Sequence, residues 1–158
     1  NMIIYIEYMF LKLKDLTCSV IKLDTNDQAY DDHTVKLEDS PWVIYLQDNN
    51  TVPLYNSFYA TRKHPYHKDD YWYDVTKFDT LVESIKKLGY KNSLCNNKVF
   101  QDNFNGNDWQ GGRGAIKMSF SGKIGDGHHR CAVLYYLYGP EYEINILPNC
   151  LIDDILPL

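Results

Sequence analysis

The sequence has no Cys-x-x-Cys pair, although it contains four cysteines. Zinc ribbons and thioredoxin-like redox sites are built on that spacing, so the sequence predicts neither of them. Nothing else in it is typical of a small secreted scaffold that is held together by disulfides. We therefore expect reduced thiols and a cytoplasmic protein.

Long hydrophobic runs are also missing. The most apolar stretch, residues 2–11, is too short to span a bilayer and is interrupted by Glu7. It has neither the basic leader nor the small-residue cleavage site of a signal peptide. No run of lysine and arginine suggests binding to an anionic membrane surface. We expect a soluble protein with no membrane partner.

Positive charge is scarce, since 16 lysines and arginines face 21 aspartates and glutamates, for a net charge of −5. This balance argues against sequence-independent binding of duplex nucleic acid, which requires many cations to neutralise phosphates. A single nucleotide needs only a few local donors and remains possible. The length of 158 residues and the hydrophobic content of 44% predict one globular domain with a real core.

The first half of the chain is predicted from periodicity and turn chemistry. Apolar residues at three- and four-residue spacing favour an amphipathic helix from Ile3 to about Thr17. Residues 20–23 are compatible with a short strand, and the polar stretch 24–39 is typical of a loop. A β-rich run at 41–46, a turn and a second arm at 52–55 predict a hairpin.

The second half has a clearer pattern. An apolar stripe predicts a helix from Asp74 that Gly89 ends. The elements expected after it are a strand at 115–120, its return at 123–125, a helix at 131–138 closed by Gly139-Pro140, and a final strand at 142–147.

The most informative motif is the predicted strand-to-helix turn Asp126-Gly127-His128-His129-Arg130. Glycine allows a tight bend and lets a ligand approach the backbone, and Asp126 can cap the helix. The N-terminus of a helix favours phosphate or carboxylate, and the fork of Arg130 can grip two oxygens. His128 and His129 add donors that titrate near neutral pH.

Adjacent residues on a helix point about 100° apart. His128 and His129 therefore cannot both face one small atom, which argues against a metal chelate at this pair. We expect one imidazole to contact a ligand while the other packs. The alternative is that both are ordinary polar residues of a first helical turn.

Two other segments are candidates for ligand binding. His64 and His67 flank Pro65, which prevents a regular helix from aligning them, so a surface loop is favoured over a metal site. The loop from Gly106 to Gly114 has no Gly-Lys-Ser/Thr ending of a P-loop. It is either a mobile connection or a lid that closes over a nucleotide with Trp109 or Arg113.

The order of these features resembles the ParB/sulfiredoxin superfamily over about residues 74–147. The features are Leu81-Val82-Glu83-Ser84-Ile85, a helix end at Gly89, two strands, Asp126-Gly127-His128-His129-Arg130, a helix and a strand. The resemblance implies an α/β fold, with a compact mixed sheet and flanking helices over 74–158. Residues 1–73 would form a helix-and-hairpin extension packed on that core in one compact domain.

Branches of this superfamily differ at the turn. Chromosome-partitioning members carry Gly-Glu-Arg-Arg, and sulfiredoxins carry Gly-Gly-Cys-His-Arg with a nucleophilic cysteine. Here His128 holds the cysteine position, and Cys131 lies beyond Arg130. Free-serine kinases share Asp-Gly-His-His-Arg and a Glu-Ser pair in the preceding helix, so this chain is most similar to them.

By that likeness, the turn from Asp126 to Arg130 would hold the phosphates of ATP, ADP or CTP, and His129 would take part in the chemistry. Ser84 would line the same pocket. The loop before that helix offers Asp69 and Asp70 as a general base, which could accept the proton of an attacking hydroxyl. Mg²⁺ would neutralise the phosphates.

Three functions remain open from the sequence. The first is a nucleotide-dependent enzyme that transfers a phosphoryl group to a small-molecule substrate or hydrolyses the nucleotide. The second is a non-catalytic, nucleotide-responsive regulatory module. The third is a ParB-like DNA-associated nuclease, against which the net negative charge weighs.

Overall fold

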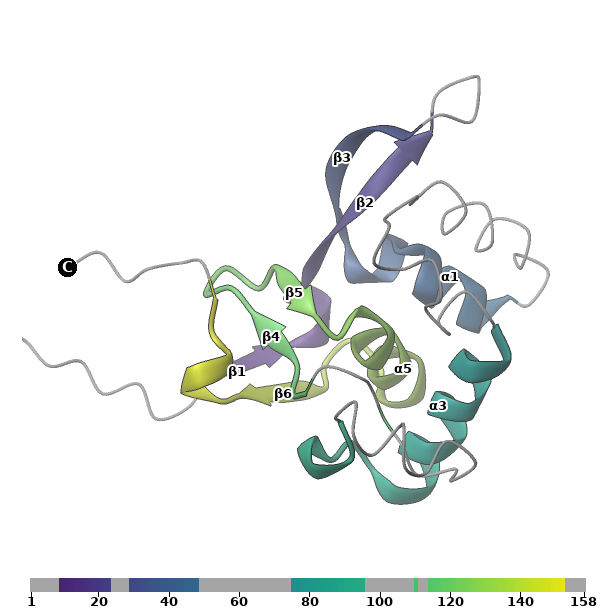
Figure 1. Ribbon diagram of the computed structural model, residues 1–158, viewed down its shortest axis with the longest axis vertical. Helices are drawn as coiled ribbons and strands as arrows, with labels where there is room; N and C mark the ends of the chain where they lie inside the picture. Colours follow the sequence, from purple (N-terminus) through teal and green to yellow (C-terminus); the bar gives the residue numbers. More distant parts are fainter. Residues whose placement is uncertain (1–8, 24–28, 49–74, 96–109, 111–113, 153–158) are drawn as a thin grey trace, which may run out of the picture.

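The structure is a computed structural model that describes residues 9–23, 29–48, 75–95, 110 and 114–152 (Figure 1). Helices and small two-stranded sheets alternate along this part of the chain, which places it in the general α/β class. None of its helices is long and apolar enough to cross a membrane. All four cysteines are free, in agreement with the predicted reduced thiols, and all four are buried.

The first strand is paired with the last one. Strand β1 (Met9–Lys12) runs antiparallel to β6 (Glu143–Ile146), with Met9 opposite Ile146. Beside them, Lys12 and Lys14 both bind the carboxylate of Glu141, at 3.0 and 2.8 Å. The strand predicted at 142–147 is thereby confirmed.

The helix predicted to end near Thr17 is wrong for the described residues. The chain instead forms β1 and a 3-10 helix, η1 (Leu13–Asp15). Phe10, a member of the predicted apolar stripe, is 61% exposed, whereas Leu13 and Leu16 are fully buried. A 3-10 helix has about three residues per turn, so a three-residue spacing also aligns these two leucines.

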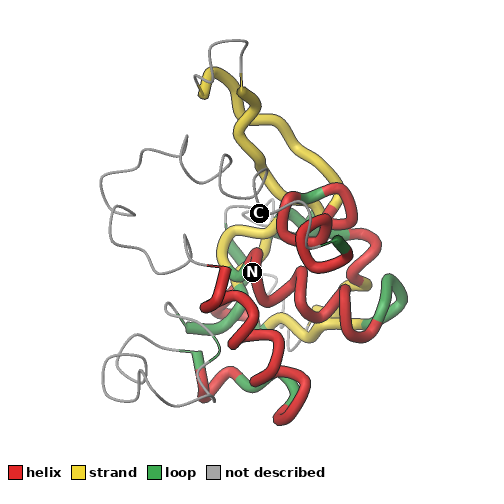
Figure 2. The backbone as a smooth tube through the Cα atoms, turned by 90° about the vertical axis from the view of Figure 1, so that its right-hand side faces the viewer, coloured by secondary structure: helices red, strands yellow, loops and turns green. Residues whose placement is uncertain are grey.

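A long hairpin follows. Strands β2 (Thr17–Leu23) and β3 (Ala29–Lys36) pair antiparallel along their whole length, and both views show them extending away from the helices (Figures 1 and 2). The strand at 20–23 is confirmed and is longer than predicted. The loop predicted at 24–39 is wrong from residue 29 onward, because backbone pairing tolerates the polar composition that indicated a loop.

Residues 41–46 form a helix rather than the first arm of a hairpin. In α1 (Pro41–Gln47) the hydroxyl of Ser40 accepts a hydrogen bond from the amide of Val43 at 3.3 Å, and Pro41 occupies the first turn. This serine cap followed by proline is a strong helix start. The predicted second arm, 52–55, lies outside the described residues.

The remaining helices and strands correspond to predicted ones, although the strand expected at 115–120 covers only two residues and the helix expected at 131–138 begins at His128. Helix α3 (Val75–Leu88) ends at Gly89, whose φ is 71°. Strands β4 (Lys117–Met118) and β5 (Ile124–Asp126) are short and antiparallel, and α5 (His128–Tyr138) ends at Gly139.

One buried cluster joins these elements. Trp42 of α1, Phe78 of α3, Leu134 of α5 and Ile146 of β6 belong to it, together with Leu13. Helix α5 packs against both α1 and α3, and the helices gather on one side of the hairpin in Figure 2. Both predicted halves of the chain therefore contribute to the same core, and α5 lies at its centre.

Candidate functional site at the turn between β5 and α5

The turn that enters α5 depends on a glycine. Gly127 is the N-cap residue and has a φ of 102°, in the left-handed region. A Cβ atom added there would lie only 2.8 Å from Cγ1 of Ile116. Both the backbone conformation and the close approach of Ile116 therefore require glycine at this position.

The N-cap position of this helix has no side chain that could cap it. Asp126 was predicted to do so, but it ends β5, and the N-cap is Gly127, which makes no side-chain cap bond. The first bond within the helix runs from the amide of Cys131 to the carbonyl of Gly127, at 2.9 Å. The first turn itself carries no acidic residue, but the carboxylate of Asp126, just before the N-cap, lies 3.8 Å from Arg130 of that turn.

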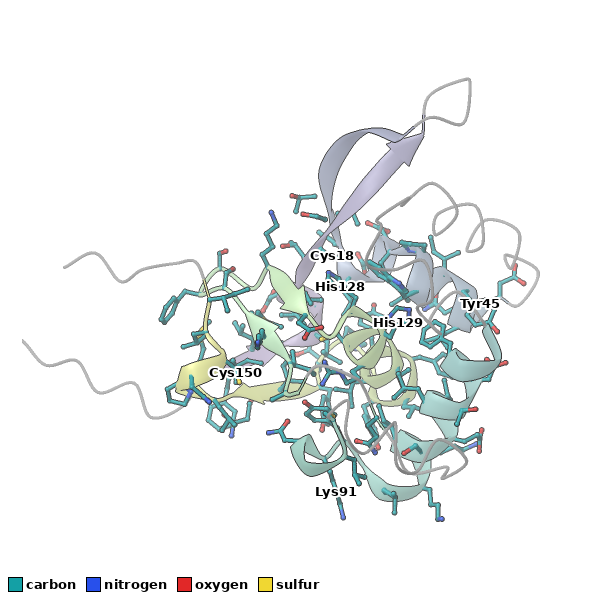
Figure 3. All side chains as sticks on the ribbon, viewed as in Figure 1. Cys18, Tyr45, Lys91, His128, His129 and Cys150 are labelled. Carbon is teal, nitrogen blue, oxygen red and sulfur yellow. The ribbon has the colours of Figure 1, made fainter. Side chains whose placement is uncertain are left out.

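The two imidazoles meet the same aromatic ring. The Trp42 ring centroid lies 4.8 Å from that of His128 and 5.9 Å from that of His129. His129 also contacts Phe78 edge-on, with centroids 4.9 Å apart. Both histidines are half-buried and lie at the start of α5, where it faces α1 (Figure 3). The fully buried indole of Trp42 therefore helps fix both rings.

Arg130 turns inward. Its side chain is 3% exposed, and its guanidinium donates a hydrogen bond to the carbonyl oxygen of Gly114. Its Nη2 lies 3.8 Å from Oδ1 of Asp126. Burial lowers the pKa of Arg130, but Tyr90, Cys95 and Asp126 more than offset this, so the pKa is raised overall. A permanent positive charge thus lies beneath the turn and binds protein oxygens.

Sequence reasoning missed the polar groups around this arginine. Tyr90 accepts a hydrogen bond from the amide of Ile116 at 3.1 Å, and the thiol of Cys95 donates to the carbonyl of Lys91 at 3.3 Å. Burial raises the pKa of both Tyr90 and Cys95. The two groups therefore stay neutral at physiological pH. No motif in the sequence marked either residue.

Ser84 lies in a buried hydrogen-bond network around Gln110, whose carbonyl accepts from the thiol of Cys95 at 3.7 Å. Ser84 is 1% exposed, and its hydroxyl accepts a hydrogen bond from Nε2 of Gln110 at 3.2 Å. Gln110 also donates to the carbonyl of Gly89 at 2.8 Å and accepts from the amide of Lys91 at 2.8 Å. This network joins the end of α3 to residue 110. The sequence had placed Ser84 in the phosphate pocket.

Several predicted residues cannot be located. Asp69 and Asp70, the candidate bases, lie outside the described residues, as do His64, His67, Trp109 and Arg113. In the described part of the chain, no group of three or more His, Cys, Asp or Glu residues is placed to hold a metal ion.

The turn therefore brings together a helix end whose N-cap residue is a glycine, two half-buried imidazoles and a buried guanidinium. Such an arrangement can bind an anion, because amide donors, imidazoles and a cation all favour negative charge. No family model, curated protein or solved structure matches this chain.

Proposed function

We propose that the chain binds a nucleotide at the turn between β5 and α5. The bound nucleotide would serve phosphoryl transfer to a small-molecule hydroxyl, or hydrolysis. The observation that carries this proposal is the entry into α5 at Gly127, which is in the left-handed conformation and has no side chain to cap the helix. A phosphate at such a helix end interacts with backbone donors and with the helix dipole.

The side chains of the turn would have different roles in binding the nucleotide. His128 and His129 are half-buried rings held against Trp42, so they would meet phosphate oxygens with little loss of freedom. Arg130 would act through its charge from beneath the turn, because its side chain is 3% exposed and its guanidinium already donates to the carbonyl of Gly114. Protonated His129 could also supply a proton to the leaving oxygen.

The remaining chemistry is assigned by resemblance. Asp69 or Asp70 would accept the proton of the attacking hydroxyl, and Mg²⁺ would neutralise the phosphates of ATP, ADP or CTP. Ser84 would act through Gln110, which it binds, by holding the end of α3. The order α3, β4, β5, α5, β6 is the order of elements on which the resemblance rests and supports the proposal, although the described strands form three two-stranded sheets rather than one mixed sheet.

The test is a thermal-shift screen against ATP, ADP, CTP and GTP, each with Mg²⁺. We expect one nucleotide to raise the melting temperature, and we expect His128→Ala and His129→Ala to weaken that effect. Tyr136→Ala is the control, since Tyr136 is 47% exposed on the same helix. No shift with any nucleotide, or equal shifts in all variants, would reject the assignment.

A second measurement separates an enzyme from a binding module. The stabilising nucleotide is incubated with protein, Mg²⁺ and candidate hydroxyl acceptors, and phosphorus NMR follows its fate. Release of a phosphoryl group supports the enzyme. A nucleotide that binds but stays intact for hours supports the regulatory alternative.

A further inference from the structure

A pocket of about 230 Å³ lies along β6, and neither histidine of the turn lines it. Residues 142–147 form one side of it, and Tyr90, Asn92 and Ile116 line the rest. Pockets for drug-sized ligands span about 300–1,000 Å³. This one therefore suits a smaller molecule, of the size of a single ring with its substituents.

The strand contributes main-chain hydrogen-bonding groups to this pocket. The amide of Leu13 donates to the carbonyl of Tyr142 at 3.0 Å. This bond shows which residues of β6 direct their backbone groups toward β1 and which direct them away from it. In an antiparallel pair, the backbone groups of alternate residues point to opposite edges. Those of Glu143 and Asn145 therefore face away from β1. Within the described residues, neither backbone makes a hydrogen bond on that edge.

The lining side chains indicate what the pocket would accept. Two tyrosine rings, Tyr90 and Tyr142, offer apolar faces, and Asn92 and Asn145 carry amides that both donate and accept. Glu143 adds a carboxylate, and none of the described residues that line the pocket is a lysine or arginine. This set disfavours phosphates and carboxylates. It suits a ring with C–H faces and many hydroxyl groups.

The aromatic surface continues beyond the pocket. Tyr142 stacks on Tyr138, with ring centroids 4.8 Å apart and planes inclined by 23°. Tyr138 is 46% exposed at the end of α5. An exposed tyrosine next to a pocket with aromatic lining could pack against a further ring of a longer ligand.

We propose that this pocket is a saccharide-binding site. One neutral or amino-bearing sugar ring would lie along the open edge of β6, between Tyr90 and Tyr142, and would hydrogen-bond to Asn92, Asn145 and the strand. Tyr138 would contact a second ring. The site shares Ile116 with the turn at Gly127 but does not depend on nucleotide binding there.

The test is an NMR titration of the ¹⁵N-labelled chain with three sugars of one ring size: glucosamine, glucose and glucuronate. We expect shifts at the amide groups of Asn92 and Asn145, with affinity falling in that order. Asn92→Trp, which would fill the mouth of the pocket, should abolish the shifts. Circular dichroism and the melting temperature establish that this variant is folded.

The charge preference has a matched control. Glu143→Gln should reduce the preference for glucosamine over glucose by about two- to fivefold, the range for a half-exposed ion pair. Glu141→Gln should leave it unchanged, because Glu141 binds Lys12 and Lys14 and does not line the pocket. The proposal fails if no sugar shifts the lining residues, if glucuronate binds best, or if Asn92→Trp binds as well as the wild type.

Discussion

The guanidinium of Arg130 lies 3.8 Å from the carboxylate of Asp126, four residues earlier, and also binds the carbonyl of Gly114. One buried cation thus joins the last residue of β5, the first turn of α5 and the segment before β4. The residue that sequence reasoning assigned to the ligand also holds the site together. A loss of nucleotide binding in an Arg130 variant would therefore not by itself identify a ligand contact.

Replacing Arg130 should lower the stability of the fold, whatever its effect on nucleotide binding. We expect Arg130→Ala to lower the free energy of unfolding by about 2–3 kcal/mol, because the hydrogen bond and the partner charge are lost together. Arg130→Lys should lose less, since it keeps the charge but not the fork. Urea denaturation of both variants measures this. An alanine variant as stable as the wild type would show that the buried contacts contribute nothing.

The glycine at the start of α5 should be more sensitive than the glycine at its end. Gly127 and Gly139 have similar φ angles, 102° and 89°, but only at Gly127 would a Cβ meet another atom, Cγ1 of Ile116 at 2.8 Å. Gly139→Ala should cost about 1–3 kcal/mol through the backbone alone, because a φ of 89° with a ψ of 177° is essentially restricted to glycine. Gly127→Ala should cost about 2–5 kcal/mol, because the contact with Ile116 is added to the cost of the left-handed backbone. Equal losses for the two variants would contradict the close approach of Ile116.

Gln110 should matter more than Ser84, although both are buried. Ser84→Ala removes one acceptor of Gln110, which keeps its bond to Gly89, so we expect a loss of about 1 kcal/mol. Gln110→Leu leaves the amide of Lys91 and the carbonyl of Gly89 without their partner and should cost about 2–4 kcal/mol. Chemical denaturation ranks the two variants. The reverse order would mean that Ser84 carries the network.

Stability should fall at alkaline pH partly because of Tyr45. Burial, together with the hydrogen bond to Asp79 at 3.0 Å, raises the pKa of Tyr45 to about 12. Between the ordinary tyrosine pKa of about 10 and that value, the unfolded chain releases a proton that the folded chain retains. The free energy of unfolding therefore decreases as the pH rises through this window.

Tyr45→Phe tests that origin, because it removes the ionisable group and keeps the ring against Phe78. Thermal melts from pH 9 to 12 should show a shallower decline in this variant than in the wild type. Tyr136→Phe, on the exposed face of α5, should decline like the wild type. Parallel curves for Tyr45→Phe and the wild type would assign the alkaline sensitivity to other groups.

The second half of the fold was predictable because its signals are local. The stripe that ends at Gly89, the helix closed by Gly139 and the strand after it each carry their own boundary residues. The backbone conformation of Gly127 is likewise a local requirement. These features can be inferred without any knowledge of what packs against them.

The prediction failed in the first half of the chain, where the same residue spacing is compatible with two kinds of helix. Leu13 and Leu16 are compatible with an α-helix and equally with the 3-10 turn that the chain adopts. At 41–46 the β-rich composition outweighed the serine cap at Ser40, which decided the outcome. The inward turn of Arg130 could not be foreseen, because it depends on Gly114, a partner fixed only by the tertiary structure.

The pairing of β1 with β6 also constrains how the chain acquires its structure. Lys12 and Glu141 bind across 129 residues of sequence, at the edge of a sheet whose two strands stand at opposite ends of the described chain. During synthesis, β1 leaves the ribosome long before its partner exists. Contacts of such long range slow folding and leave early segments exposed. A nascent chain that stalls before Glu143 would present an unpaired apolar strand, which is a natural target for chaperones and proteases.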